Sequence, residues 1–149
     1  MRRWWISILM FVMVPACWAK LALQYAVKFV CGRSNGTVVA PGLYFTAINI
    51  HNPSDEQDNK FLKKVAIALP DKESPPTPFK EASLKPDGAI EIDCAEILSM
   101  AKKEGFLKGF VVLESKSELD VVGVYTAAGS TRQIETMEIE RVPVRKIEP

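Results

Sequence analysis

Turn-forming residues punctuate this sequence at short intervals, and their spacing is the strongest constraint on how the chain can fold. The stretches between the turns are short and rich in β-branched and aromatic side chains, which is typical of β-strands. Strands that recur about every ten residues, without long helical patterns between them, predict an antiparallel sandwich or barrel rather than parallel βαβ units. The expected strands cover residues 26–31, 37–40, 43–51, 61–69, 79–85, 89–93, 109–114, 119–126 and 133–142.

Two of these strands have a predicted place in the sheet. The run from Leu43 to His51 is apolar on both faces over most of its length, so we expect it to be central and covered. The last strand, at 133–142, is followed by Pro143, which confines it to an edge because proline has no backbone N–H to donate.

Two turns predict β-hairpins. A Pro-Asp-Gly turn between residues 79–85 and 89–93 is expected to use Gly88 for a positive φ and to pair its two strands. A four-residue polar turn between residues 109–114 and 119–126 is expected to pair the two strands on either side of it.

One short helix is predicted. Asp93 can cap it, and Glu96 stands three residues later, which is the spacing of a capping box. Lys102 and Lys103 complement the negative end of the helix dipole, and Gly105 is the expected stop. We expect the helix between this cap and this stop to have two to three turns.

The first residues of the chain predict export. The pair Arg2–Arg3 precedes an uncharged apolar run from Trp4 to Ala19, and small residues end it. This run accounts for part of the 48% hydrophobic content, so the remaining chain is less apolar than the average suggests. The predicted organisation is a signal peptide or membrane anchor helix at residues 1–25 and a β-sandwich domain at residues 26–149, on the periplasmic face of the inner membrane.

Three fates for this leader stay open. Cleavage after Ala19 is one, because Ala19 is small and Cys17 occupies the other small-residue position. Retention as an anchor through residues 4–19 is another, with Lys20 reaching the interface and residues 21–26 extending the helix. Lipid attachment at Cys17 is the third, since the preceding Val-Pro-Ala resembles a lipoprotein box.

The two remaining cysteines, Cys31 and Cys94, fit an oxidising compartment. A disulfide between them would close a loop of 94 − 31 = 63 residues. Chain entropy alone gives such a bond a stabilisation of about 4 kcal/mol. Two separate buried thiols are the alternative, and the spacing does not decide between them.

Charge and residue counts argue against several functions. With Lys+Arg 19 and Asp+Glu 18, the net charge of +1 offers no electrostatic footprint for nucleic acid. His51 is the only histidine, so it has too few partners for a metal site, and no nucleophile elbow or phosphate loop occurs. We expect no cofactor, no metal and no enzymatic activity. The carboxylates that might pair across strands are interpreted as solvated edge charges: Glu91, Asp93, Glu114 and Asp120.

Three segments carry a resemblance to a known family. They are YFTAINIHNP at residues 44–53, LDVVGVYTA at residues 119–127 and IERVPVRK at residues 139–146. With the turns between them, the chain resembles a family of small exported bacterial β-sandwich proteins of immunoglobulin-like architecture. The resemblance implies an all-β, antiparallel β-sandwich of about eight strands with one short helix, preceded by an N-terminal hydrophobic helix. Its motifs are structural, so it transfers no functional residues.

These observations favour a non-enzymatic, membrane-associated interaction module. Its most concrete form is an accessory or structural subunit of a membrane protein complex on the periplasmic face. The partners expected are other membrane or periplasmic proteins, and the membrane itself through residues 4–19. Loops on a rigid scaffold are the candidate contact surfaces. The residues singled out in two such loops, 52–59 and 71–78, are Asn52, Asp55, Glu56, Pro75 and Pro76.

The alternative function is a periplasmic module that binds a small ligand or a carbohydrate. Such a module needs aromatic side chains gathered on one exposed face. Tyr44, Phe45 and Tyr125 are the candidates that the predicted strands offer.

Overall fold

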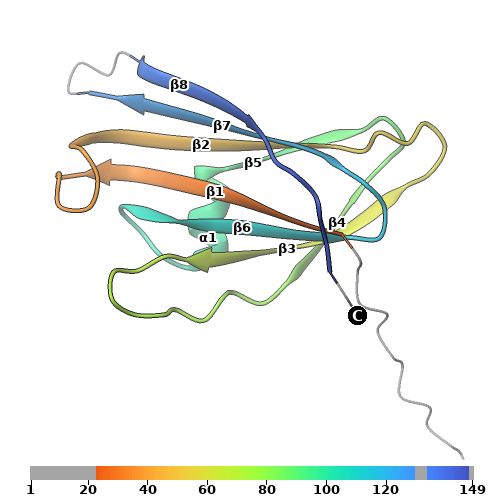
Figure 1. The fold of residues 1–149 in the computed structure, drawn as a ribbon, viewed down its shortest axis with the longest axis horizontal. Coiled ribbons are helices and arrows are strands. Elements are labelled where there is room, and N and C mark those ends of the chain that lie inside the picture. Colours follow the sequence, from red (N-terminus) through yellow and green to blue (C-terminus); the bar gives the residue numbers. More distant parts are fainter. Residues whose placement is uncertain (1–22, 130–133, 148–149) are drawn as a thin grey trace, which may run out of the picture.

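Antiparallel β-strands form nearly all of the fold (Figure 1). The structure is a computed structural model that describes residues 23–129 and 134–147, and the predicted leader with Cys17 lies outside these residues. The strands are β1 (Leu23–Ser34), β2 (Gly42–His51), β3 (Asn59–Ile67), β4 (Lys80–Leu84), β5 (Ala89–Asp93), β6 (Leu107–Ser115), β7 (Asp120–Ala128), β8 (Ile134–Arg141) and β9 (Arg145–Lys146). One helix, α1 (Cys94–Ala101), follows β5. The predicted all-β class with a single short helix is confirmed for the described part of the chain.

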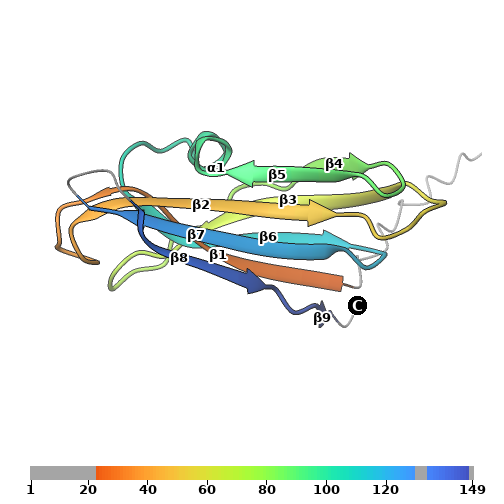
Figure 2. The same ribbon diagram turned by 90° about the horizontal axis from the view of Figure 1, so that it is seen from above.

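The strands follow one path, β4-β3-β6-β1-β2-β7-β8, with β5 paired to β2 and β9 to β1. Along this path β1 and β2 meet only where Gly32–Ser34 pairs with Gly42–Tyr44. The strands therefore fall into two groups joined at that short corner: β4-β3-β6-β1-β9 and β5-β2-β7-β8. Figure 2 shows α1 and β5 along one side of the molecule and β8 and β9 along the other.

One hydrophobic cluster lies between these elements. Alternate residues of β1 point into it, because successive side chains of a strand face opposite sides. Its largest fully buried members come from both groups of strands and from α1: Tyr25, Phe29, Phe61, Ile48, Ile50, Ile92, Ile97, Leu113, Val27, Val65, Val111 and Val121.

The two predicted hairpins are wrong. β4 pairs with β3 and β5 pairs with β2, so the Pro-Asp-Gly turn carries the chain from one group of strands to the other. Asp87, at φ 53°, adopts the left-handed conformation there rather than Gly88. β6 and β7 likewise belong to different groups, since β6 pairs with β1 and β3 while β7 pairs with β2 and β8. A tight turn reverses the chain locally, but the partner of each strand depends on where its apolar side chains can be buried.

Both crossings are held by buried asparagines instead of hairpin pairing. Asn52 donates from its side chain to the Lys85 carbonyl oxygen at 3.0 Å, beside the first crossing. Asn59 donates to the Glu118 carbonyl oxygen at 3.1 Å and accepts from the Ser115 hydroxyl at 2.8 Å, at the second crossing. These side chains supply hydrogen bonds to backbone carbonyl oxygens at crossings where the flanking strands do not pair with each other.

The strand predicted at residues 37–40 is a loop. Asn35 accepts the Thr37 N–H and hydroxyl through Oδ1, at 3.1 and 2.8 Å, a local bond that competes with strand pairing. Val38 is 43% exposed, so this segment buries too little apolar surface to join the sheet. The first strand is longer than predicted, and Leu23–Tyr25, counted with the leader on the sequence alone, open β1. Residues 23–26 therefore do not extend a leader helix.

The predicted helix is confirmed at its start and corrected at its end. The Asp93 side chain accepts the Glu96 N–H at 2.8 Å, as expected of an N-cap. The Glu96 side chain pairs with Lys63 at 2.6 Å, an interaction that the capping-box pattern did not predict. The helix ends at Ala101, and its C-cap Lys102 takes the left-handed conformation three residues before Gly105.

A disulfide joins Cys31 of β1 to Cys94 at the start of α1, with Cα atoms 5.5 Å apart. The bond fixes to each other two positions that are 63 residues apart in the sequence. The alternative of two free thiols is therefore ruled out for this structure. Among residues 23–129 and 134–147, no helix is long and apolar enough to cross a bilayer.

Candidate interaction surface

The loop after β2 is largely structural. Asn52 is only 1% exposed, and its side chain also donates to the Gln57 carbonyl oxygen at 2.8 Å. The prediction that Asn52 is a contact residue is therefore wrong, because its buried side chain bonds within the molecule and shapes the loop. Asp55 and Glu56 are exposed, as a contact surface requires.

The proline-rich loop after β3 is exposed at Pro75 and Pro76 but anchored at Thr77. The Thr77 N–H donates to the Val65 carbonyl oxygen, and its hydroxyl accepts the Val65 N–H, both at 2.9 Å. This loop follows β3, whereas the loop containing Asp55 precedes it. The two predicted loops therefore lie at opposite ends of one strand and do not form one surface (Figure 1).

A third surface gathers more exposed apolar side chains than either loop. On β2 and β8, Phe45 is 51% exposed, Met137 is 63% and Ile139 is 64%. The strand register places them in two adjacent rows with residues of β7 between them. These rows, which we call the outer patch, are Phe45–Thr126–Met137 and Ala47–Val124–Ile139.

The outer patch corrects the prediction that the strand at 43–51 is covered. β2 is central in its sheet, and Ile48 and Ile50 are fully buried on one face. Phe45 points to the other face, which no described residue covers at that position. The sequence signal in β8 is the alternation of Met137 and Ile139 with glutamates, which marks an edge strand but does not identify its neighbours.

The opposite face of the same strands borders a groove of about 730 Å³. Its lining includes Tyr44, Tyr125, Glu138 and Glu140, together with Lys28 of β1. The Tyr125 hydroxyl donates to the Glu140 carboxylate at 3.0 Å. Burial raises the pKa of Tyr125, and the bond to Glu140 raises it further, so this hydroxyl stays protonated.

The three aromatic residues of the ligand-binding alternative all border this groove, since Phe45 joins Tyr44 and Tyr125 in its lining. They do not form one aromatic face, however. Alternation along β2 turns Phe45 to the outer patch and Tyr44 to the opposite side.

A charged cluster lies at the other end of the same strands. His51 contacts Asp87 through Nε2 at 3.0 Å and Asp120 through Nδ1 at 3.3 Å, and Arg141 donates to Asp120 at 2.8 Å. The hydrogen bonds to Asp87 and then Asp120 raise the pKa of His51. When the ring is protonated, both nitrogens donate to these carboxylates and neither has a free lone pair. Within the described ranges, no three His, Cys, Asp or Glu side chains converge to hold a metal ion.

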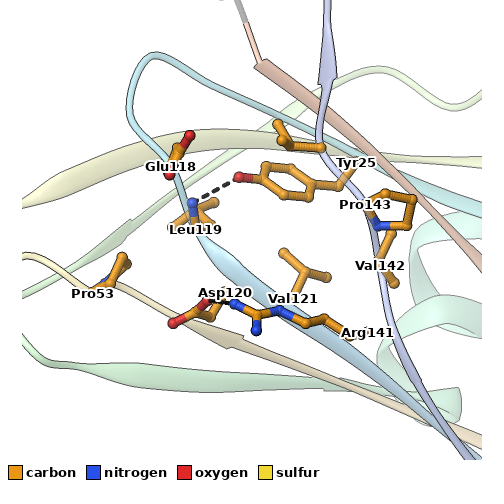
Figure 3. A pocket seen from close by; sticks show the side chains of 10 residues that line it. Tyr25, Pro53, Glu118, Leu119, Asp120, Val121, Arg141, Val142 and Pro143 are labelled. Atoms are coloured by element: carbon orange, nitrogen blue, oxygen red, sulfur yellow. Dashed lines mark hydrogen bonds and ion pairs between the residues drawn. The ribbon is translucent and has the colours of Figure 1, made fainter.

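A cavity of about 410 Å³ adjoins this cluster (Figure 3). Its lining combines Asp120 and Arg141 with Tyr25, Leu119 and Val142. The Tyr25 hydroxyl accepts the Leu119 N–H there at 2.8 Å. Arg141 likewise donates to Asp120 within the lining, so these two contacts hold the strands together around the cavity.

Comparisons with known proteins identify a fold but no family. No protein-family model matches the chain, and no curated protein matches it in sequence. The crystal structure described as Thermotoga maritima 1070 is similar, with a TM-score of 0.57 and 11% sequence identity. The similarity covers 84% of this chain and 95% of that chain. At this identity the likeness extends to the fold alone.

Proposed function

We propose that this protein is an exported, non-enzymatic interaction module, most concretely an accessory or structural subunit of a membrane protein complex on its periplasmic face. The observation that carries this proposal is the outer patch. Three large apolar side chains, Phe45, Met137 and Ile139, are each more than half exposed and lie in adjacent rows of one sheet. Clustered exposed apolar side chains on a folded domain mark a contact surface.

The energetics favour a protein partner on this surface. Fully burying an exposed large apolar side chain contributes about 1.5–3 kcal/mol. Phe45, Met137 and Ile139 are each between half and two-thirds exposed, so each can contribute a corresponding part of that amount on docking. Phe45 is aromatic and Met137 is flexible, and both residue types are enriched at the centres of protein interfaces.

Export is supported by two independent features. The disulfide between Cys31 and Cys94 is stable in an oxidising compartment and rare in the cytosol. The basic pair and apolar run at residues 2–19 have the composition of an export signal. We further propose that the two strand groups are the layers of an immunoglobulin-like β-sandwich, as in the exported family that the sequence resembles, and that the leader is a hydrophobic helix.

The test uses the full chain with an affinity tag, extracted from membranes in mild detergent. We expect a partner at fixed stoichiometry with the wild type and its loss with Met137→Ser/Ile139→Ser. The matched control is Phe110→Ser, since Phe110 is 44% exposed on β6 in the other strand group. Equal recovery from all three proteins, or no partner with the wild type, would refute the proposal.

A ligand-binding module is the second candidate, supported by the groove that Tyr44 and Tyr125 border. Oligosaccharides bind by stacking on aromatic rings and hydrogen bonding to carboxylates such as Glu138. Saturable chemical-shift changes with a glycan panel, abolished by Tyr125→Ala, would support this function. Unchanged spectra across the panel would remove it.

A further inference from the structure

We propose that the free edge of β8 receives an extended segment of a partner protein in which basic and apolar residues alternate. The added segment continues the sheet β5-β2-β7-β8 by one strand. This inference rests on the proposed function and specifies the chemistry of the partner.

The backbone of β8 offers the pairing edge. β8 runs over eight residues, Ile134–Arg141, and pairs with β7 along one side. The strand path ends at β8, so within the described residues its second side faces no other strand. A strand edge of this kind presents N–H and C=O groups that an extended peptide can satisfy.

The side chains of β8 differ sharply between its two faces. Met137 and Ile139 project to the outer patch, where they are 63% and 64% exposed. Glu138 and Glu140 alternate with them and so project to the opposite face, and both line the groove, which Met137 also borders. A strand beside β8 therefore meets apolar groups on one face and carboxylates on the other.

The carboxylates on the groove side form no ion pair with any described residue. No ion pair among the described residues includes Glu138 or Glu140, and Arg141, the one basic residue of β8, is engaged by Asp120 at 2.8 Å. Lys28 is a cation in the lining of the groove, against two carboxylates from β8. Residues directly opposite across an antiparallel pair interact best when their charges are complementary. Lysine or arginine opposite the glutamates, with apolar residues opposite Met137 and Ile139, satisfies both faces together.

The same charges disfavour a second copy of this chain. If the β8 strands of two copies pair antiparallel about Glu138, Glu138 of one copy lies opposite Glu138 of the other. If they pair about Ile139, Glu138 of one copy lies opposite Glu140 of the other. Like charges directly opposite destabilise a strand pair. The glutamates thus disfavour these two registers of self-pairing while leaving the edge open to a basic strand.

The test measures fluorescence anisotropy of labelled eight-residue peptides with the full chain in mild detergent. One peptide alternates lysine with valine, a second alternates glutamate with valine, and a third has four lysines followed by four valines. We expect saturable binding of the alternating lysine–valine peptide, weaker by about tenfold for each of the others, because only the first matches both faces. Binding should also weaken as the salt concentration rises.

Charge reversal provides the decisive variant. With Glu138→Lys/Glu140→Lys, the preference should invert, so that the glutamate–valine peptide binds more tightly than the lysine–valine peptide. The matched control is Glu73→Lys/Glu104→Lys, which changes the same charge at exposed positions away from β8 and should keep the wild-type preference.

The inference would be overturned by equal binding of the block peptide, by a preference that does not invert, or by dimerisation of the chain through β8. If no peptide binds while partner recovery still depends on Met137 and Ile139, the inference fails and the proposed function stands. If both measurements are negative, both fail.

Discussion

At the scale of single residues, one tyrosine hydroxyl satisfies the backbone where β7 begins. Tyr25 is 2% exposed and accepts the Leu119 N–H at 2.8 Å (Figure 3). Tyr25→Phe keeps the ring but leaves this buried N–H without a partner, which costs about 1–3 kcal/mol. Urea unfolding of the variant measures this loss.

Tyr44→Phe is the control for that substitution. The Tyr44 hydroxyl donates to the Ala40 carbonyl oxygen at an exposed position, so water can replace it. We expect its free energy of unfolding to change by no more than about 0.5 kcal/mol. Equal losses in the two variants would contradict the role assigned to Tyr25.

A second prediction at this scale concerns pH. Hydrogen bonds to Asp87 and Asp120 raise the pKa of His51 above that of the unfolded chain. The protonated ring therefore contributes stability that is complete below the unfolded pKa of about 6.5 and is lost as the pH rises through the folded pKa. The difference in free energy of unfolding between wild type and His51→Gln should be larger near about pH 5.5 than near about pH 9. A difference independent of pH would show that the two contacts do not favour the protonated ring.

At the scale of elements, two buried asparagines hold the crossings between the strand groups, Asn52 in the loop after β2 and Asn59 at the start of β3. Asn59 is 4% exposed and joins Ser115 and Glu118 at the start and end of the second crossing. Asn59→Ala leaves these groups unpaired, so we expect a loss of about 1–3 kcal/mol in the free energy of unfolding. Asp55→Ala, at an exposed position in the loop that precedes Asn59, should change it by less than about 0.5 kcal/mol. Thermal or urea unfolding distinguishes the two, and equal effects would refute the structural role of Asn59.

The disulfide is the other element-scale constraint, because it ties α1 to β1. Removing it with Cys31→Ala/Cys94→Ala should lower the free energy of unfolding by about 4 kcal/mol, mainly by enlarging the unfolded ensemble. Reductant should destabilise the wild type and leave this variant unchanged. Cys17→Ser should respond to reductant like the wild type, and a wild type insensitive to reductant would contradict the bond.

The positions of the elements could be predicted from the sequence better than their partners. The strand at 43–51 and the cap at Asp93 follow from local composition and local hydrogen bonding, and both are confirmed. The two hairpin predictions are wrong because the strands on either side of each turn pair with strands that are distant in sequence, where their apolar side chains are buried. A turn pattern does not contain such long-range contacts.

At the scale of the whole molecule, the candidate surface exists only through strand register. Phe45 and Met137 are far apart in sequence. They lie in one row because Thr126 of β7 pairs with Phe45 on one side and with Met137 on the other. Neither the loop positions nor the alternation in β8 indicates which strands lie side by side. The sequence therefore supports export and a β fold, whereas the outer patch depends on the pairing of β2, β7 and β8.

Site-specific photo-crosslinking in cells shows whether the outer patch docks on another protein. A photoreactive phenylalanine analogue replaces Met137 in one strain and Phe110 in another, since both side chains are exposed. The account predicts one adduct of discrete mass from position 137 and none from position 110. The same adducts from both positions, or none from position 137, would contradict it.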